Sequence, residues 1–150
     1  MDVKMFIDTG LLRDEEICLK LDRVLPGKPE KNRVPACFFH ICAPDGTNMG
    51  GCDLRIGHNQ NLYYGGNIGY HVFPPYRGHH YAARACRLLF GLAKRYGMGY
   101  VIITCNPDNI PSRRTCEALG GVLEDIVDLP PGNDMYQNGE RQKCIFRFTL

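Results

Sequence analysis

The sequence has no apolar run that approaches the ~18 residues of a membrane-spanning helix, and residues 1–10 lack the apolar core of a signal peptide. Its net charge is only +2, from 18 basic and 16 acidic residues. Such a small charge gives no reason to expect nucleic acid or an anionic membrane as a partner. We therefore expect a cytoplasmic protein in which any anion site is local.

Metal-binding and disulfide patterns are missing as well. The eight cysteines include no C-x-x-C pair, and most lie in apolar segments where cysteine serves as a small hydrophobic residue. Disulfide frameworks are typical of shorter secreted chains, whereas 150 residues can bury a core without covalent links. We expect free thiols, no metal, and one domain spanning residues 1–150.

What the first half does contain is the pattern of antiparallel strands. Residues 15–22 alternate apolar and polar side chains, whereas the prolines, glycine and charges of residues 24–35 are typical of a loop. The segments 36–43 and 52–57 predict a hairpin connected through Asp45-Gly46.

The second half alternates strands with helices. An apolar stripe at helical spacing predicts an amphipathic helix that ends at Gly97, and Asn109 is a typical cap for a second helix. The expected elements are strand 67–73, helix 82–96, strand 100–105, helix 110–119, and strands 121–129 and 141–150. The first helix joins strands 67–73 and 100–105, which predicts a parallel crossover in a mixed α/β fold with antiparallel flanks.

The segment YRGHHYA, residues 76–82, turns strand into helix. A helix N-terminus presents about four unpaired N–H groups and roughly half a positive charge, which suits an anion such as phosphate. Gly78 allows close approach, and Arg77 adds a charged donor. The other interpretation is a plain turn with a solvated arginine. Neither G-x-G-x-x-G nor G-x-x-x-x-G-K-[ST] is present, which excludes a Rossmann fingerprint and a P-loop.

Residues 69–97, GYHVFPPYRGHHYAARACRLLFGLAKRYG, resemble the acyl-CoA-binding motif of the GNAT family of N-acetyltransferases, in which R-G-x-G-x-G/A opens a helix. Residues 106–121, NPDNIPSRRTCEALGG, are similar to the family's second motif, N-x-x-S/A followed by E-x-x-G. The resemblance covers about residues 62–128. It implies a mostly antiparallel central sheet with a parallel β-α-β unit at the acyl-CoA site and helices on its faces.

The resemblance also implies the contacts of coenzyme A. Backbone N–H groups of residues 77–82 (Arg77, Gly78, His79, His80, Tyr81 and Ala82) would hold the pyrophosphate. Val72 and Phe73 would pair with the pantetheine arm, and Asn109 and Ser112 would line its far side. In the alternative interpretation, Val72 and Phe73 are core residues and Asn109 only caps its helix.

The implied reaction is direct transfer of acetyl from acetyl-CoA to a primary amine of a small molecule or peptide, with a homodimer as a possible assembly. Two residues depart from the family pattern. His80 replaces a glycine, so it must either adopt a backbone conformation that a residue with a Cβ tolerates or lie farther from the phosphate. Cys116 stands where many members have a tyrosine that protonates the thiolate; packing is its alternative role.

The acceptor end of the site is less defined by sequence. His71 and Glu124 are candidate bases, with a hydrogen-bonded sheet residue and a solvent-facing residue as the respective alternatives. Asp53, Tyr63 and Tyr64 would border the acceptor cleft. Family members usually have two helices where this chain has residues 24–35, so the pocket is open, completed by a partner subunit, or formed by residues 129–141.

Two other functions are compatible with the same residues. A non-catalytic acyl-CoA sensor or interaction module would explain His80 and the missing tyrosine at position 116. A nucleotide-phosphate binder would need only the helix N-terminus at residues 76–82.

Overall fold

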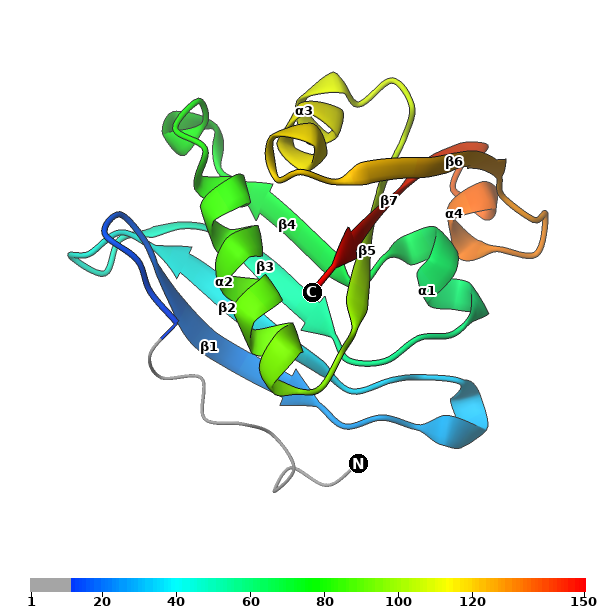
Figure 1. The fold of residues 1–150 in the computed structure, drawn as a ribbon, viewed down its shortest axis with the longest axis horizontal. Coiled ribbons are helices and arrows are strands. Elements are labelled where there is room, and N and C mark those ends of the chain that lie inside the picture. The colour runs from blue at the N-terminus through cyan, green and yellow to red at the C-terminus, as the bar shows by residue number, and fades with distance from the viewer. Residues whose placement is uncertain (1–11) are drawn as a thin grey trace.

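The structure is a computed structural model that describes residues 12–150 (Figure 1). The segment 1–10, for which we expect no signal peptide, lies outside these residues. The elements are β1 (Cys18–Leu25), β2 (Ala36–Cys42), β3 (Asn48–Arg55), α1 (Gln60–Gly65), β4 (Ile68–Val72), α2 (Tyr81–Arg95), β5 (Tyr100–Cys105), α3 (Ile110–Ala118), β6 (Val122–Asp128), α4 (Asp134–Gln137) and β7 (Gln142–Thr149). None of the helices found within residues 12–150 has the length and apolar character needed to cross a membrane.

The strands form two antiparallel sheets, ordered β1-β2-β3-β4 and β5-β7-β6 (Figure 1). The predicted mixed α/β fold is confirmed, and α2 joins β4 to β5 as expected. However, β4 and β5 lie in separate sheets and share no ladder within the described chain. Strand β5 is mostly buried, yet it is the edge strand of its sheet, and β7 is the central one.

Asn67 connects the two sheets where they meet. Its N–H donates to the Ile102 carbonyl at 2.7 Å, and its Oδ1 accepts the Ile102 N–H at 2.9 Å. Its Nδ2 donates to the carbonyl oxygens of Gly57 at 2.8 Å and Arg55 at 3.1 Å. This buried side chain therefore replaces a ladder at the start of β4, and the strands separate beyond it.

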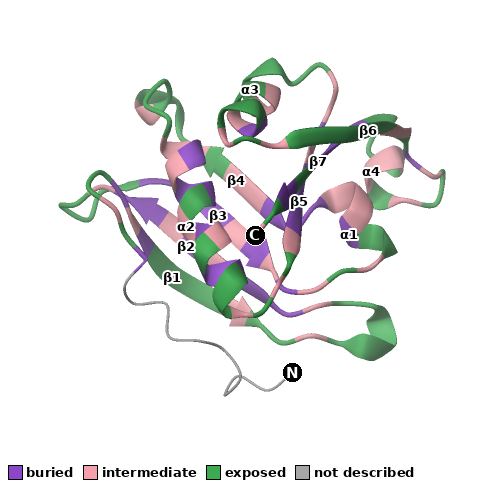
Figure 2. Ribbon diagram, viewed as in Figure 1, coloured by how far each residue is buried: buried purple, intermediate pink, exposed green. Residues whose placement is uncertain are grey.

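Helix α2 closes the core between the two sheets. Its apolar stripe, predicted from the sequence, is buried at Ala85, Cys86, Leu89, Leu92 and Ala93, so one side of the helix is purple in Figure 2. The Phe90 ring lies 5.0 Å from that of Phe148 on β7, measured between centroids.

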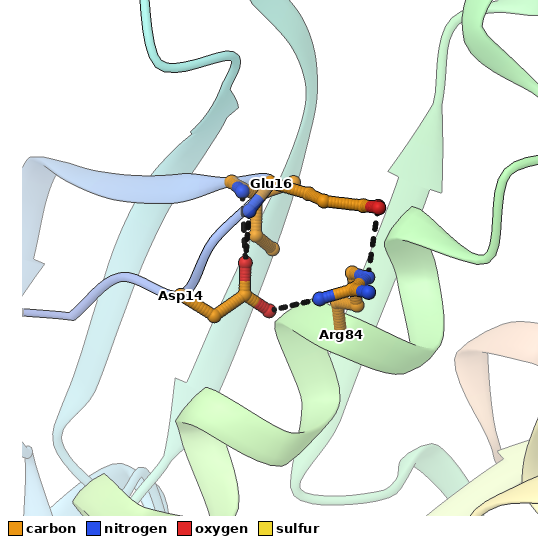
Figure 3. Close-up of polar contacts among 4 residues, drawn as sticks. Asp14, Glu16 and Arg84 are labelled. Atoms are coloured by element: carbon orange, nitrogen blue, oxygen red, sulfur yellow. Dashed lines mark hydrogen bonds and ion pairs between the residues drawn. The ribbon is translucent and has the colours of Figure 1, made fainter.

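The first turn of α2 is tied to the segment that precedes β1 (Figure 3). Arg84 contacts the carboxylates of Asp14 and Glu16, each at 3.0 Å. Asp14 also accepts the N–H groups of Glu16 and Ile17. Burial alone would raise the pKa of Asp14, but these N–H groups and Arg84 together lower it. The contacts anchor the helix end that opens the candidate site.

Two short helices were not predicted from sequence. Helix α1 begins after Asn59, whose side chain accepts the Leu62 N–H at 2.9 Å, and α4 begins after Asn133, which accepts the Met135 N–H at 2.8 Å. Both helices are shorter than two turns, so no apolar period can be recognised in their sequences. The connection from β1 to β2 contains only a 3₁₀ turn, Pro29–Lys31, in agreement with the predicted loop.

Candidate functional site

Strand β4 presents part of its backbone to the space between the sheets. At its two ends, the Arg55 N–H donates to the Asn67 carbonyl at 2.7 Å and the Phe73 N–H donates to the Met49 carbonyl at 2.8 Å. Peptide groups alternate in direction along an antiparallel ladder, so those of Tyr70 and Val72 point away from β3, toward β5. The Arg77 Nε donates to the Val72 carbonyl at 2.8 Å.

A cavity of about 980 Å³ occupies the space between β4 and β5. Its α2 and α3 side is lined by Arg77, Gly78, His80, Tyr81, Asn109 and Ser112. Its other side is lined by Arg55, Gly69, His71, Met135, Glu140 and Lys143. Val72 and Ala82 also line the cavity, which therefore contains most of the residues expected to bind coenzyme A. The same cavity extends to the face of β4 that points away from α2.

The turn before α2 has a left-handed backbone at two positions. Gly78 has φ 89°, and His80 has φ 62° and ψ 24° at the N-cap of the helix. His80 thus adopts the αL conformation that the family glycine would adopt easily, and histidine is one of the residues that tolerates it best. Its side chain makes no capping hydrogen bond, so the N-terminal N–H groups of α2 are not capped by it.

On the α3 side of the cavity, Ser112, which was expected to line the pantetheine arm, contacts Tyr70, which the sequence analysis did not name. The Ser112 hydroxyl lies 2.7 Å from the Tyr70 hydroxyl, which links α3 to β4 across the cavity. Burial raises the pKa of Tyr70, so its phenol is protonated at neutral pH. Tyr70 and Val72 are two residues apart on β4, so their side chains lie on the same face of the sheet. Because Val72 was expected at the site, this spacing was the sequence signal from which Tyr70 could have been predicted. Asn109 accepts the Ser112 N–H at 3.3 Å and so caps α3.

Cys116 lies in the core, with no exposed surface, instead of lining the cavity. Burial raises its pKa to about 12. A thiol without access to the cavity is not placed to donate a proton to a bound thiolate. The structure therefore favours packing, one of its two predicted roles.

Six other predicted residues are not among those that line the cavity: Asp53, Tyr63, Tyr64, Phe73, His79 and Glu124. Glu124 is exposed on β6 and pairs with Arg147 at 3.7 Å. The Phe73 N–H is bonded to β3, and its side chain is 40% exposed. His79 stacks on Tyr81, with ring centroids 5.4 Å apart. By contrast, His71 lines the cavity on the face opposite α2.

The acceptor side combines charged residues from two regions. Asp53 and Arg55 on β3 approach to 3.5 Å, and Lys143 Nζ contacts Glu140 Oε1 at 2.7 Å. The hydrogen bond to Lys143 lowers the pKa of Glu140. Glu140 and Met135 belong to the segment 129–141, so this segment forms part of the cavity wall.

The other residues expected at this end lie on α1. Tyr63 and Tyr64 pack edge to face, with ring centroids 5.5 Å apart, and the Tyr64 carbonyl accepts a hydrogen bond from the Thr104 hydroxyl at 2.8 Å.

All eight cysteines are free thiols, as predicted. Within residues 12–150, no group of three or more histidine, cysteine or acidic side chains is arranged to hold a metal ion.

One comparison with known proteins identifies a family. The family model described as acetyltransferase (GNAT) domain matches residues 9–122, more than half of the chain. No curated protein sequence matches significantly.

Solved structures share the fold at low sequence identity. An acetyltransferase of the GNAT family from Bacillus anthracis has a TM-score of 0.59 and 22% identity, over 75% of this chain and 65% of that one. The Microcin C7 self immunity acetyltransferase MccE, in complex with acetyl-CoA and AMP, has 0.59 and 20%, over 77% and 61%. A ribosomal-protein-S5-alanine acetyltransferase from Vibrio fischeri has 0.60 and 19%, over 76% and 61%. The chain thus spans less than two thirds of the length of these structures.

Proposed function

The chain belongs to the GNAT family of acetyltransferases, and from this we propose that it transfers an acetyl group from acetyl-CoA to a primary amine by direct attack. The observation that carries the proposal is the cavity between β4 and β5, which opens at the turn before α2. An extended thioester could pair with the backbone of β4 there while its phosphates reach the helix N-terminus.

The residues at this end suit the coenzyme. A Cβ built on Gly78 would meet no atom within 4 Å, so the turn leaves room for a bulky oxyanion. Arg77 would add a charged donor, and the N–H groups at the start of α2 would complete the pyrophosphate site. Val72 would pair with the pantetheine arm through its peptide group, and Asn109 and Ser112 would line the opposite side.

Catalysis would then depend mainly on positioning and backbone polarity. A β4 N–H that faces the cavity, at Tyr70 or Val72, would hydrogen-bond to the thioester carbonyl and stabilise negative charge on its oxygen. Acetyl-CoA would supply the activated acyl carbon. The leaving thiolate needs a proton, and the hydroxyl pair of Ser112 and Tyr70, which lie 2.7 Å apart and both line the cavity, would supply it.

We propose a peptide or protein amine as the preferred acceptor class. Only a 3₁₀ turn connects β1 and β2, so no helix of this connection covers the acceptor side of the sheet. An open approach suits the end of a folded protein better than a small molecule, which gains affinity from enclosure. The name of the Vibrio fischeri neighbour, which acts on ribosomal protein S5, supports this class.

Thermal shift with acetyl-CoA, coenzyme A and ATP tests the proposal. A ligand at 100 times its Kd stabilises a protein by about 2.7 kcal/mol, which is a Tm increase of roughly 5–10 °C at this size. We expect this shift with both forms of the coenzyme and a smaller one with ATP. Equal stabilisation by ATP would favour a nucleotide-phosphate binder, and no shift with any ligand would refute the proposal.

Turnover is the second part of the test. Free thiol is measured while the protein and acetyl-CoA are incubated with alanyl and seryl peptides, spermidine and ethanolamine. We expect thiol release with at least one peptide. Stabilisation by acetyl-CoA without thiol release from any amine would instead support the acyl-CoA sensor, the function that the αL His80 and the buried Cys116 favour.

A further inference from the structure

Two glycines on the face opposite α2 make room for two ionisable side chains. Asp53 pairs with Gly69, and His71 pairs with Gly51, across β3 and β4. A Cβ on Gly69 would lie 2.7 Å from Asp53 Oδ1, and a Cβ on Gly51 would lie 2.7 Å from His71 Cε1. The carboxylate therefore occupies the space over Gly69, between the lining residues Gly69, His71 and Arg55, and Asp53 lies directly behind this part of the cavity wall.

The Asp53 carboxylate is incompletely satisfied. Its side chain is only 15% exposed, and Oδ2 is buried without a hydrogen-bond partner among residues 12–150. The Arg55 Nε lies 3.5 Å away, well beyond the ~2.7–2.9 Å of a charge-assisted hydrogen bond. A buried carboxylate in this state is stabilised by any cation that can donate a hydrogen bond to it.

The carboxylate also lies beside the expected position of the thioester. Gly69 and His71 flank Tyr70, whose peptide group faces the cavity together with that of Val72. An amine that approaches from the face opposite α2 would pass Asp53 before it reached an acyl group held by these peptide groups. A proton acceptor has to contact the ammonium group before the amine attacks the acyl carbon, and Asp53 has this position.

We propose that Asp53 binds the ammonium group of the acceptor and takes its proton, while Arg55 holds the carboxylate in place over Gly69. The inference rests on the proposed acetyl transfer and names the acceptor end of that site. Asp53 is the catalytic residue here, and Arg55 is a positioning residue.

The step balances in atoms and charge. The ammonium gives one proton to an Asp53 oxygen, and its freed electron pair forms the C–N bond to the acyl carbon. The C–S bond breaks, the sulfur takes a proton from the hydroxyl pair at Ser112, and the nitrogen loses its second proton, which restores that pair. Amide and thiol are the products, and Asp53 releases its proton to solvent.

The groups around Asp53 define its pH dependence. Burial raises its pKa, while Arg55 on its own strand and His71 on β4 lower it, with a net increase. On β2, Asp53 is paired with Phe38, which is uncharged. The guanidinium carbon of Arg23 lies 4.4 Å from the centroid of the Phe38 ring. Activity should fall as the pH drops through the pKa of Asp53, because the protonated acid cannot accept a proton.

The first test compares Asp53→Asn with Asp22→Asn. Asp22 lies on β1, outside the cavity, and pairs with His40 at 3.3 Å, so it is a matched Asp-to-Asn change in the same sheet. We expect Asp53→Asn to lower kcat/KM for the amine about 100-fold or more and to remove the acidic limb of the pH profile. The Kd of acetyl-CoA should stay within threefold, and Asp22→Asn should change neither quantity.

If Asp53→Asn keeps kcat/KM within threefold, or keeps the acidic limb, the inference is wrong while acetyl transfer stands. A second measurement is independent of turnover. The Asp53 carboxyl carbon, ¹³C-labelled and assigned by its loss in Asp53→Asn, is followed by NMR during titration with n-butylammonium chloride. We expect a saturable shift that tetramethylammonium, which has no N–H donor, does not produce.

The two experiments separate the two failures. A saturable butylammonium shift in a protein that acetylates no amine would refute the proposed function and leave the ammonium site in place. Turnover without such a shift, or an equal shift with tetramethylammonium, would refute the ammonium site and leave the function.

Discussion

Replacement of His80 by glycine tests how the turn before α2 is built. His80 has φ 62° and makes no capping hydrogen bond, so its side chain contributes strain without a cap. A non-glycine residue in αL costs about 1–2 kcal/mol, and glycine loses about 0.5–1 kcal/mol more conformational entropy on folding. The net effect of His80→Gly is therefore a stabilisation between about 0 and 1.5 kcal/mol.

Urea unfolding and calorimetry measure the two expected consequences. For a chain of this size, about 1.5 kcal/mol corresponds to a Tm increase of at most ~6 °C. Coenzyme A affinity should be unchanged or higher, because the backbone N–H groups at the helix start can approach the phosphate more closely without a Cβ. His80→Val, a β-branched residue in αL, is the opposite control and should destabilise by more than about 1 kcal/mol.

Two results would refute this reasoning. A loss of stability above about 1 kcal/mol in His80→Gly would mean that the imidazole stabilises the fold by more than the αL strain costs. A loss of more than tenfold in coenzyme A affinity, with the fold intact, would mean that the imidazole itself donates to phosphate. In that case the departure from the family glycine is a binding contact and not a strained replacement.

Three further substitutions test the surrounding structure. Asn67→Ala removes three side-chain hydrogen bonds and leaves buried backbone groups unpaired, so urea unfolding should show a loss of about 3 kcal/mol or more; a loss below about 1 kcal/mol would contradict its connecting role. Tyr70→Phe should lower kcat while the Kd of acetyl-CoA stays within threefold, and an unchanged kcat would exclude the Ser112 pair as proton donor. Arg84→Met should lower Tm at pH 7, and the difference should shrink below the ordinary aspartate pKa of 3.8, because the stability linked to the lowered pKa of Asp14 is lost on protonation; an equal difference at pH 2.5 would contradict this.

The sequence predicted those parts of the fold that have a local cause. The apolar stripe of α2, the β-branched run of β5 and the Asn109 cap all act over a few residues, and each element formed where its pattern indicated. Helices α1 and α4 are too short to show a period, so their caps alone could not identify them.

The parts of the candidate site that could be predicted lie in the two motifs, residues 69–97 and 106–121. Asn67 connects to Arg55, Gly57 and Ile102, which are 10 to 35 residues away, so no local pattern reveals its role. Cys116 shows the opposite case. Its spacing in the second motif suggested a catalytic position, whereas its burial is decided by tertiary packing.

The separation of β4 and β5 also affects how the protein avoids aggregation. Each strand has an edge that faces the other across the cavity, and Tyr100–Cys105 is an uncharged, β-branched run without proline. Such a segment on an outer edge would readily pair with another chain, and proteins usually protect it with charges or prolines. Here the opposite strand shields it, so backbone groups remain accessible to an extended ligand but not to a neighbouring folded molecule.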